Sequence, residues 1–267
     1  MTDLIEKRAG DLLWLAAEDI AAPHAFTARY GGVSTESLAS LNLGEHRGDA
    51  EENVRKNYEI VCAALGFDPE NLVFSRQVHG RTVRVVTGAD RHALFAPVPF
   101  EADGLVTTKP GLTLVIFTAD CVPILLYDPV RGAVGACHAG WRGTSLDIAG
   151  ETVRAMCAAF GCRPENIRAA VGPAIGACCF ETDGDVPAAM RARLGPAAEP
   201  FIHALPADRY RVDLKALNAA LLRRAGAAVS AVSADCTMCR HDRFWSHRYT
   251  RGDRGSQAAF IMLPQNG

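Results

Sequence analysis

Three residues carry side chains that commonly bind a catalytic metal ion: His79, Cys121 and His138. Catalytic zinc sites take three protein ligands from His, Cys and carboxylate side chains and leave one coordination position for water or substrate. Each of the three residues lies at the end of a predicted strand or in the adjoining loop, where a scaffold exposes a side chain and still holds it in place. The residue types therefore predict a His2Cys metal site, although their spacing alone is a weak signal.

The same residues fit a second chemistry that needs no metal. Cys121 could act as a nucleophile that His138 activates and Asp120 orients. In a purely structural interpretation, Cys121 is a core residue, Asp120 a cap and His138 a hydrogen-bonded turn residue. We disfavour that interpretation because the segment Asp-Cys, beside a strand, faces His-Ala-Gly-Trp-Arg-Gly. The two segments bring together several reactive residues and residues that are costly to bury, more than a purely structural role requires.

Arginines near these residues are candidates for binding an anionic group of a substrate. Arg76, Arg142 and Arg248 each carry a guanidinium, which binds phosphate or carboxylate through two parallel hydrogen bonds. Surface salt bridges are the alternative role, and they are a stronger alternative for Arg248 than for the two arginines beside the predicted ligands. Asp120 adjoins a predicted ligand and is expected to act as an acid or base or, more commonly, to orient that ligand.

Two further cysteine pairs are less informative. Cys236 and Cys239 have the CxxC spacing of zinc ribbons and redox dithiols, but no second CxxC accompanies them. We expect a structural loop there, with a redox or zinc role as the alternative. Cys178 and Cys179 are predicted to be packing residues, because a disulfide between adjacent cysteines is strained.

Composition limits the class of protein. The chain has 267 residues and 28 Lys and Arg against 30 Asp and Glu, so its net charge of -2 creates no field that would attract nucleic acid or an anionic membrane. We therefore expect a small-molecule substrate. The sequence has no apolar run of about 18 residues, and its acidic start does not resemble a signal peptide, which predicts a cytoplasmic protein with reduced thiols. No interface pattern is evident, so a monomer is expected.

The elements that must position the candidate site can be predicted from local patterns. A helix is expected from about Ala50 to Leu65, ending at Gly66. Apolar and β-branched runs predict strands over 72–74, 82–86, 112–118, 123–127, 133–137, 167–171, 229–232 and 258–262. Helical spacing predicts two further helices, one over 145–160 and one that starts after Asp213.

The turn Asp128-Pro129-Val130-Arg131-Gly132 predicts a hairpin between the two central strands that flank it. In an antiparallel hairpin the start of the first strand lies beside the end of the second, so Cys121 and His138 are expected to be neighbours. Hairpins and crossover helices occur together, which predicts an α/β fold with mixed sheets. The sequence shows no linker, so a single domain over residues 1–267 is expected.

The chain contains five long motifs: SRQVHG, ADGLVTTKPGLTLVIFTADCVPILLYDP, GACHAGWRGT, VGPAIGACCFE and CTMCRHDRFWSHR. Together they closely resemble the family of bacterial YfiH-like proteins. Members of this family are called laccase-domain proteins, multicopper polyphenol oxidases, peptidoglycan editing factors and purine nucleoside phosphorylases. The matches run from about Phe26 to Ile261 and cover nearly the whole chain.

The resemblance implies a four-layer α/β/β/α fold with mixed sheets and a zinc site formed by His79 in QVHG, Cys121 in ADC and His138 in HAGWRG. It also implies phosphorolysis of adenosine, inosine and methylthioadenosine, with adenosine deamination as a further activity. The sequence departs from the family pattern at Ser256, where members often carry Arg, and at His247, where Tyr is common. These departures concern substrate binding and not the metal ligands.

The names of the family imply different reactions, and the sequence makes some of these reactions more plausible than others. A laccase with four coppers needs many histidines, usually in His-x-His pairs, and this chain has eight histidines and no such pair. One copper ion in the His2Cys site would still allow weak oxidase activity. Zinc that lowers the pKa of bound water suits deamination, and an arginine such as Arg76 or Arg142 suits phosphate binding. Amide hydrolysis of a cell-wall precursor is the alternative activity.

Overall fold

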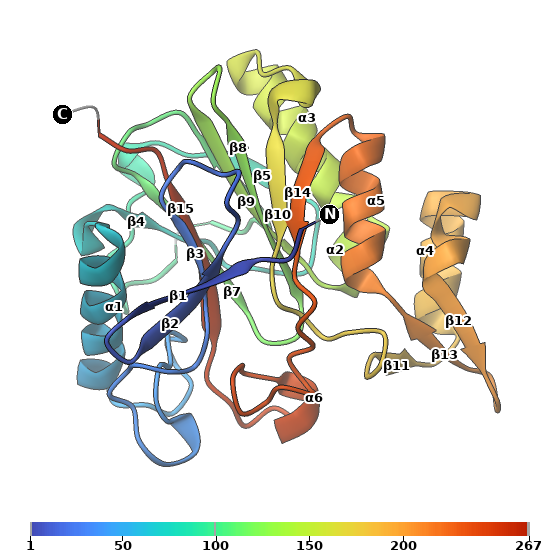
Figure 1. Cartoon of the computed structure of the whole chain (residues 1–267), viewed down its shortest axis with the longest axis horizontal. Coiled ribbons are helices and arrows are strands. Elements are labelled where there is room, and N and C mark those ends of the chain that lie inside the picture. The colour runs from blue at the N-terminus through green and yellow to red at the C-terminus, as the bar shows by residue number, and fades with distance from the viewer. Residues whose placement is uncertain (1, 99, 266–267) are drawn as a thin grey trace.

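The computed structural model describes residues 2–98 and 100–265 and shows an α/β fold with mixed sheets, as predicted (Figure 1). The first sheet has the strand order β1-β2-β3-β15-β7-β4. Its strands are β1 (Ile5–Ala9), β2 (Leu12–Ala16), β3 (His24–Thr27), β4 (Leu72–Val73), β7 (Thr113–Thr118) and β15 (Gln257–Met262). All neighbours pair antiparallel except β4 and β7, which are parallel.

The second sheet has the strand order β14-β10-β8-β9-β6-β5. Its strands are β5 (Val83–Val85), β6 (Gly104–Thr107), β8 (Val122–Asp128), β9 (Ala133–Ala139), β10 (Arg168–Val171) and β14 (Ala228–Val232). The central strands pair antiparallel and the two edge strands pair parallel with their neighbours. Strand alternation gives each sheet two apolar faces, and both faces are buried.

Three apolar clusters hold the layers together. One lies between the two sheets and includes Leu114 and Ile116 of the first sheet and Leu125 of the second. A second packs helix α1 (Glu51–Leu65) onto the other face of the first sheet. The third packs helices α3 (Ile148–Phe160) and α5 (Leu214–Arg224) onto the outer face of the second sheet (Figure 1). Each sheet is therefore packed against the other sheet on one face and against helices on the other, which fixes the ends of the central strands.

Local signals located several elements correctly. Helix α1 ends at Gly66, which adopts the left-handed conformation that glycine accommodates without strain. Asp213 caps α5 by accepting a hydrogen bond from the backbone N–H of Ala216. The predicted hairpin is also confirmed, because β8 and β9 pair antiparallel and bring Pro123 opposite His138.

The helix predicted over 145–160 is confirmed from Ile148 to its end at Phe160, but its predicted start at Ser145 is wrong. The segment instead contains the short helix α2 (Trp141–Ser145) and then α3, which begins at Ile148. Asp147 separates them with a positive φ of 59°, and its side chain caps α3 by accepting a hydrogen bond from the N–H of Gly150. The apolar spacing that suggested one helix belongs to α3, and the capping aspartate was not recognised as its start.

A small third sheet projects from the main body beside α4, at the right of Figure 1. It consists of β11 (Glu181–Thr182), β13 (Arg209–Val212) and β12 (Ile202–Leu205), and the adjoining helices are α4 (Asp185–Leu194) and α6 (His247–Thr250). Short 3-10 helices occupy Glu36–Leu38, Pro69–Asn71, Gly88–Asp90, Pro164–Asn166 and Gly195–Phe201. Within the described part of the chain, every helix is too short or too polar to cross a membrane.

Candidate metal centre

The fold brings His79, Cys121 and His138 together. Their side-chain ligand atoms all lie within 4.8 Å of one another. Sγ of Cys121 is 3.9 Å from Nε2 of His79, and the two imidazole rings meet edge to face with centroids 4.8 Å apart. Three ligands of the types that bind zinc thus converge from three different chain segments.

Each ligand lies near the end of a strand or in the connection that adjoins one. His79 lies between β4 and β5, Cys121 lies between β7 and β8, and His138 is near the end of β9. The β8–β9 hairpin brings Cys121 and His138 close together, as its register requires. His79 comes from a separate loop, so its position depends on contacts that bring that loop onto the two sheets.

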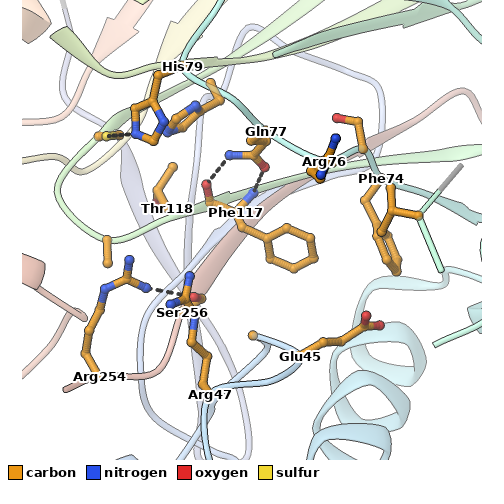
Figure 2. A pocket seen from close by; sticks show the side chains of 16 residues that line it. Glu45, Arg47, Phe74, Arg76, Gln77, His79, Phe117, Thr118, Arg254 and Ser256 are labelled. Atoms are coloured by element: carbon orange, nitrogen blue, oxygen red, sulfur yellow. Dashed lines mark hydrogen bonds between the residues drawn. The ribbon is translucent and has the colours of Figure 1, made fainter. Parts of the chain in front are cut away.

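Asp103, which precedes β6, fixes the His79 loop. Its carboxylate accepts hydrogen bonds from the backbone N–H groups of Val78, His79 and Gly80 at 3.2, 3.0 and 2.7 Å. Gln77 adds a second anchor, because its side-chain amide donates to the carbonyl of Phe117 and accepts from its N–H, both at 2.8 Å (Figure 2). These bonds hold His79 at a positive φ of 60°.

Asp103 also orients His138. Its Oδ1 lies 2.9 Å from Nδ1 of His138, and both side chains are buried. A histidine held through one ring nitrogen presents the other nitrogen for metal coordination. Sequence reasoning gave this supporting role to Asp120 and missed Asp103, whose only signal was its place in the motif that begins Ala-Asp-Gly.

The residues of the site are strongly coupled electrostatically. Burial disfavours the protonated ring of His138, but Cys121 and Asp103 outweigh burial and raise its pKa to about 9. Burial likewise disfavours the Cys121 thiolate, but His138 and His79 outweigh it and lower the pKa of Cys121 to about 6. At neutral pH the cysteine is therefore a thiolate, which is the form that binds metals and acts as a nucleophile.

Asp120 does not contact the ligand side chains through its carboxylate. Its Oδ1 accepts a hydrogen bond from the Thr237 hydroxyl and its Oδ2 accepts one from the Arg248 backbone N–H, both at 2.6 Å. It has a positive φ of 86° immediately before Cys121. The residue thus ties the 237–248 segment to the loop that carries the cysteine.

Gly140 lies against the candidate ligands. A Cβ atom at this position would be 2.7 Å from Cδ2 of His79 and 3.0 Å from Sγ of Cys121. Only a residue without a side chain fits there while the ligands keep their positions. The glycine that follows His-Ala in the sequence is thus required by the close approach of three chain segments.

The three residues open onto a pocket of about 340 Å³, within the usual size range of small-molecule sites. Figure 2 shows His79 on one side of this pocket and Arg254, Ser256 and Arg47 on another. The remaining lining residues are Gly44, Glu45, Phe74, Ser75, Arg76, Gln77, Val98, Phe117, Thr118, Ala119, Cys121 and His138. A metal ion held by the three ligands would contact a molecule bound there.

Arginines line this pocket, but only one of them was predicted. Arg76 lines it and forms an ion pair with Glu101. Arg47 and Arg254 were not predicted, and Arg254 donates a hydrogen bond to Ser256 Oγ at 2.9 Å while its Nε has no partner. Burial and the nearby Arg47 lower the pKa of Arg254 to about 10, so it remains charged at neutral pH.

The other two arginines singled out from the sequence have different surroundings. Arg142 is not among the lining residues of this pocket, and its guanidinium lies 4.2 Å from the centroid of the Trp141 ring. Arg248 donates to the backbone carbonyl of Glu181 at 2.9 Å. Arg248 thus links α6 to the start of the small third sheet.

The fold also brings together four cysteines that the sequence left as two unrelated pairs. The sulfur atoms of Cys178, Cys179, Cys236 and Cys239 all lie within 4.8 Å of one another. Cys178 is exposed and Cys179 is half-buried, so the prediction that both are packing residues is wrong for Cys178. The CxxC pair is thus joined by Cys178 and Cys179, which lie 57 positions or more upstream. No common sequence motif has this spacing, so the group could not be predicted.

A family model described as multi-copper polyphenol oxidoreductase laccase matches residues 23–264. A protein of Deinococcus radiodurans named purine nucleoside phosphorylase is 43% identical over 94% of this chain and 93% of its own length. Purine nucleoside phosphorylase YlmD of Geobacillus stearothermophilus is 38% identical over 98% of this chain and 97% of its own. The crystal structure of the Bacillus licheniformis hypothetical protein YfiH has a TM-score of 0.91 at 37% identity, covering 97% of this chain and 98% of that one.

Proposed function

The chain belongs to the multi-copper polyphenol oxidoreductase laccase family, and we propose that it is a zinc-dependent purine nucleoside phosphorylase with adenosine deaminase as a second activity. We further propose adenosine, inosine and methylthioadenosine as its substrates. The observation that supports this proposal best is the convergence of His79, Cys121 and His138 on a pocket that also contains arginines. Relatives named purine nucleoside phosphorylase, aligned over nearly the whole chain, support the choice of reaction.

His79, Cys121 and His138 would hold the zinc ion. The donor set fits, because it combines two imidazoles with a thiol whose pKa is about 6 and leaves one position of a tetrahedron free. A bound zinc ion would supply Lewis acidity at this end of the pocket. Among the described residues, only two histidines converge in this group, whereas a laccase with four coppers needs many more.

The arginines would bind the second substrate. Phosphorolysis forms a bond between a phosphate oxygen and C1′ of the ribose while the bond from C1′ to the purine nitrogen breaks. We assign phosphate binding to Arg254, Arg47 and Arg76, because guanidinium groups bind phosphate through paired hydrogen bonds. Arg254, which donates to Ser256 Oγ, would also supply a positive charge beside the position at which the family resemblance implies an arginine.

The same orientation of the nucleoside accommodates deamination. Deamination replaces the amino group at C6 of adenine by oxygen from water and releases ammonia. A nucleoside bound with its ribose toward the arginines would direct its base toward His79 and Cys121, where a bound zinc ion would supply Lewis acidity. One pose thus serves both proposed reactions.

A specific arrangement favours a second candidate function, the hydrolysis of an amide in a cell-wall precursor. Cys121, His138 and Asp103 form a chain in which a thiolate faces a histidine that a buried carboxylate orients. This is the arrangement of a nucleophilic cysteine, its base and an orienting acid. The thiolate would attack the amide carbon, and His138 would protonate the leaving amine as the C–N bond breaks. Water, deprotonated by His138, would then attack the thioester, release the carboxylic acid and restore the Cys121 thiolate.

The experiment that separates these functions measures zinc and copper in the purified protein and the phosphate-dependent release of free adenine from adenosine. We expect stoichiometric zinc and release of adenine that requires phosphate. Zinc without adenine release would contradict phosphorolysis, whereas zinc-free protein that cleaves the amide would favour hydrolysis by Cys121. Stoichiometric copper with phenol oxidation would favour the oxidase named by the family model. The Cys121→Ala protein serves as the background control in each assay.

A further inference from the structure

A second group of metal-binding side chains lies outside the pocket. It consists of Cys178 and Cys179, which precede β11, and Cys236 and Cys239, which follow β14. Sγ of Cys239 lies 3.6 Å from Sγ of Cys178 and 3.3 Å from Sγ of Cys179. All nine cysteines of the chain are free thiols, and these four have gathered without forming a disulfide.

The separations of the four sulfur atoms match a tetrahedral site. Zinc binds cysteine sulfur at about 2.3 Å, so two sulfur atoms on one tetrahedral ion lie about 3.8 Å apart. The four sulfur atoms of the group all lie within 4.8 Å of one another, so their separations are close to the distance of about 3.8 Å expected for sulfur atoms that share one ion. A small contraction around an ion would bring each sulfur to its bonding distance.

The backbone around Cys236 is arranged as it is around a metal-bound thiolate. The N–H of Gly176 donates to Sγ of Cys236 at 3.2 Å, and the N–H groups of Met238 and Cys239 also point to this sulfur. A Cβ atom at Gly176 would be 3.1 Å from the sulfur of Cys178, a contact that would require this sulfur to shift. Hydrogen bonds from backbone N–H groups stabilise thiolate and orient it toward an ion.

The charge of the surroundings suits a site of four thiolates, which carries a net charge of about -2 around a divalent ion. Lys215 is buried beside the group and interacts electrostatically with Cys178 and Cys236. Its ammonium donates to the carbonyls of Ser233 and Asp235 at 2.6 Å, so it is held in place. A fixed cation thus offsets part of the negative charge.

We propose that Cys178, Cys179, Cys236 and Cys239 bind a structural zinc ion, separate from the ion at His79, Cys121 and His138. Four protein ligands leave no position for substrate, which is the property of structural zinc sites. The ion would join the 176–180 turn to the 236–240 turn. Thr237, within the second turn, donates to Asp120, so the ion would also stiffen the segment that carries Cys121.

The test uses the full-length protein with zinc as the only added metal. We expect two zinc ions per chain in the natural protein, one in Cys121→Ala, one in Cys239→Ser and none in the double variant. Cys239 is exposed, so its replacement should leave the fold intact, which circular dichroism checks. Cys157→Ser, which changes a half-buried cysteine outside both groups, is the matched control and should retain both ions.

Cobalt(II) bound to the Cys121→Ala protein provides a second measurement on an unperturbed four-cysteine group. Intense thiolate-to-cobalt absorption of a tetrahedral four-sulfur site supports the proposal. A single zinc ion in the natural protein that Cys121→Ala removes completely overturns it, as does a disulfide within the group in the denatured, alkylated protein. Either result would overturn the four-cysteine site and leave the ion at Cys121 standing, so failure of this proposal is distinguishable from failure of the proposed function.

Discussion

Nδ1 of His138 lies 2.9 Å from Oδ1 of Asp103, and the same buried carboxylate accepts hydrogen bonds from the N–H groups of residues 78, 79 and 80. One side chain therefore orients one candidate metal ligand and positions the loop that carries another. Burial raises the pKa of Asp103, but its bonds to His138 and to the Gly80 N–H outweigh burial and lower it. The carboxylate is thus ionised at neutral pH.

Replacing Asp103 by Asn should weaken the metal site. The amide NH2 cannot accept from the N–H groups that the carboxylate now satisfies, so both His79 and His138 lose their orientation. We expect a loss of about 10- to 100-fold in zinc affinity, the usual effect of removing a supporting partner of a metal ligand. Zinc titration measures it. Asp90→Asn, which alters a half-buried carboxylate that also accepts a backbone N–H, is the control and should bind zinc normally.

Cys121→Ala should remove both the zinc at this site and the turnover of nucleosides. One ligand of three dominates affinity for the ion, whereas a core of this size does not depend on one half-buried thiol. Elemental analysis, circular dichroism and the adenine-release assay check the three parts. Undiminished activity in metal-free Cys121→Ala protein would refute the zinc mechanism.

Gly140→Ala should impair metal binding through a steric effect alone. The added methyl group would approach His79 to 2.7 Å and Cys121 to 3.0 Å, so one ligand must move. We expect lower zinc occupancy with an unchanged circular dichroism spectrum. Gly88→Ala is the matched control, because its nearest neighbours are the end of the Arg91 side chain at 3.9 Å. Equal zinc affinity in the two variants would contradict the close packing of the site.

Arg254→Gln should raise the KM for phosphate without unfolding the protein. A hydrogen bond to a charged group contributes about 1.5–3 kcal/mol, which corresponds to roughly 10- to 100-fold in affinity. Phosphorolysis rates at varied phosphate concentration measure the change. Arg154→Gln alters an exposed arginine of α3 and should leave the KM unchanged. An unchanged KM for phosphate in Arg254→Gln would refute its assignment.

His24 should make stability depend on pH. The ring is buried, its Nε2 accepts from the N–H of Ala17 at 2.9 Å, and its Nδ1 lies 2.8 Å from the carbonyl of Ala22, an arrangement that requires the neutral form. Burial lowers its pKa below the ordinary value of 6.5. The unfolded chain therefore binds a proton more readily, so the contribution of His24 is complete above pH 6.5 and is lost as the pH falls below it.

Denaturant unfolding at several pH values measures this effect. His24→Gln should lower the free energy of unfolding at pH 7 by about 1–3 kcal/mol, because the Gln side chain cannot reach both the N–H of Ala17 and the carbonyl of Ala22, so one of them loses its partner. Its stability should also decrease less than that of the natural protein as the pH falls below 6.5. His203→Gln changes an exposed histidine of β12 and should reproduce the pH dependence of the natural protein. Identical pH profiles for His24→Gln and the natural protein would exclude the mechanism.

Much of the fold could be predicted because its signals are local. The end of α1 at Gly66, the cap of α5 at Asp213 and the β8–β9 hairpin each depend on residues within a few positions of one another. The hairpin register alone explains why Cys121 and His138 meet. The β1, β2 and β3 strands were not predicted. The pairing of β3 with β15 joins opposite ends of the chain, whereas β1 and β2 form a local hairpin that the prediction missed.

The amino-acid sequence by itself therefore determined the mixed α/β class, the central hairpin and the candidate ligand set. Only the tertiary structure placed Asp103 beneath His138, brought Arg47 and Arg254 to the pocket and joined Cys178 and Cys179 to Cys236 and Cys239. The residue preferences of turns and the periodic spacing of apolar residues both depend on residues that are close together along the chain. Contacts between distant segments arise from the packing of the sheets and helices. Local sequence patterns do not indicate which loops that packing brings together.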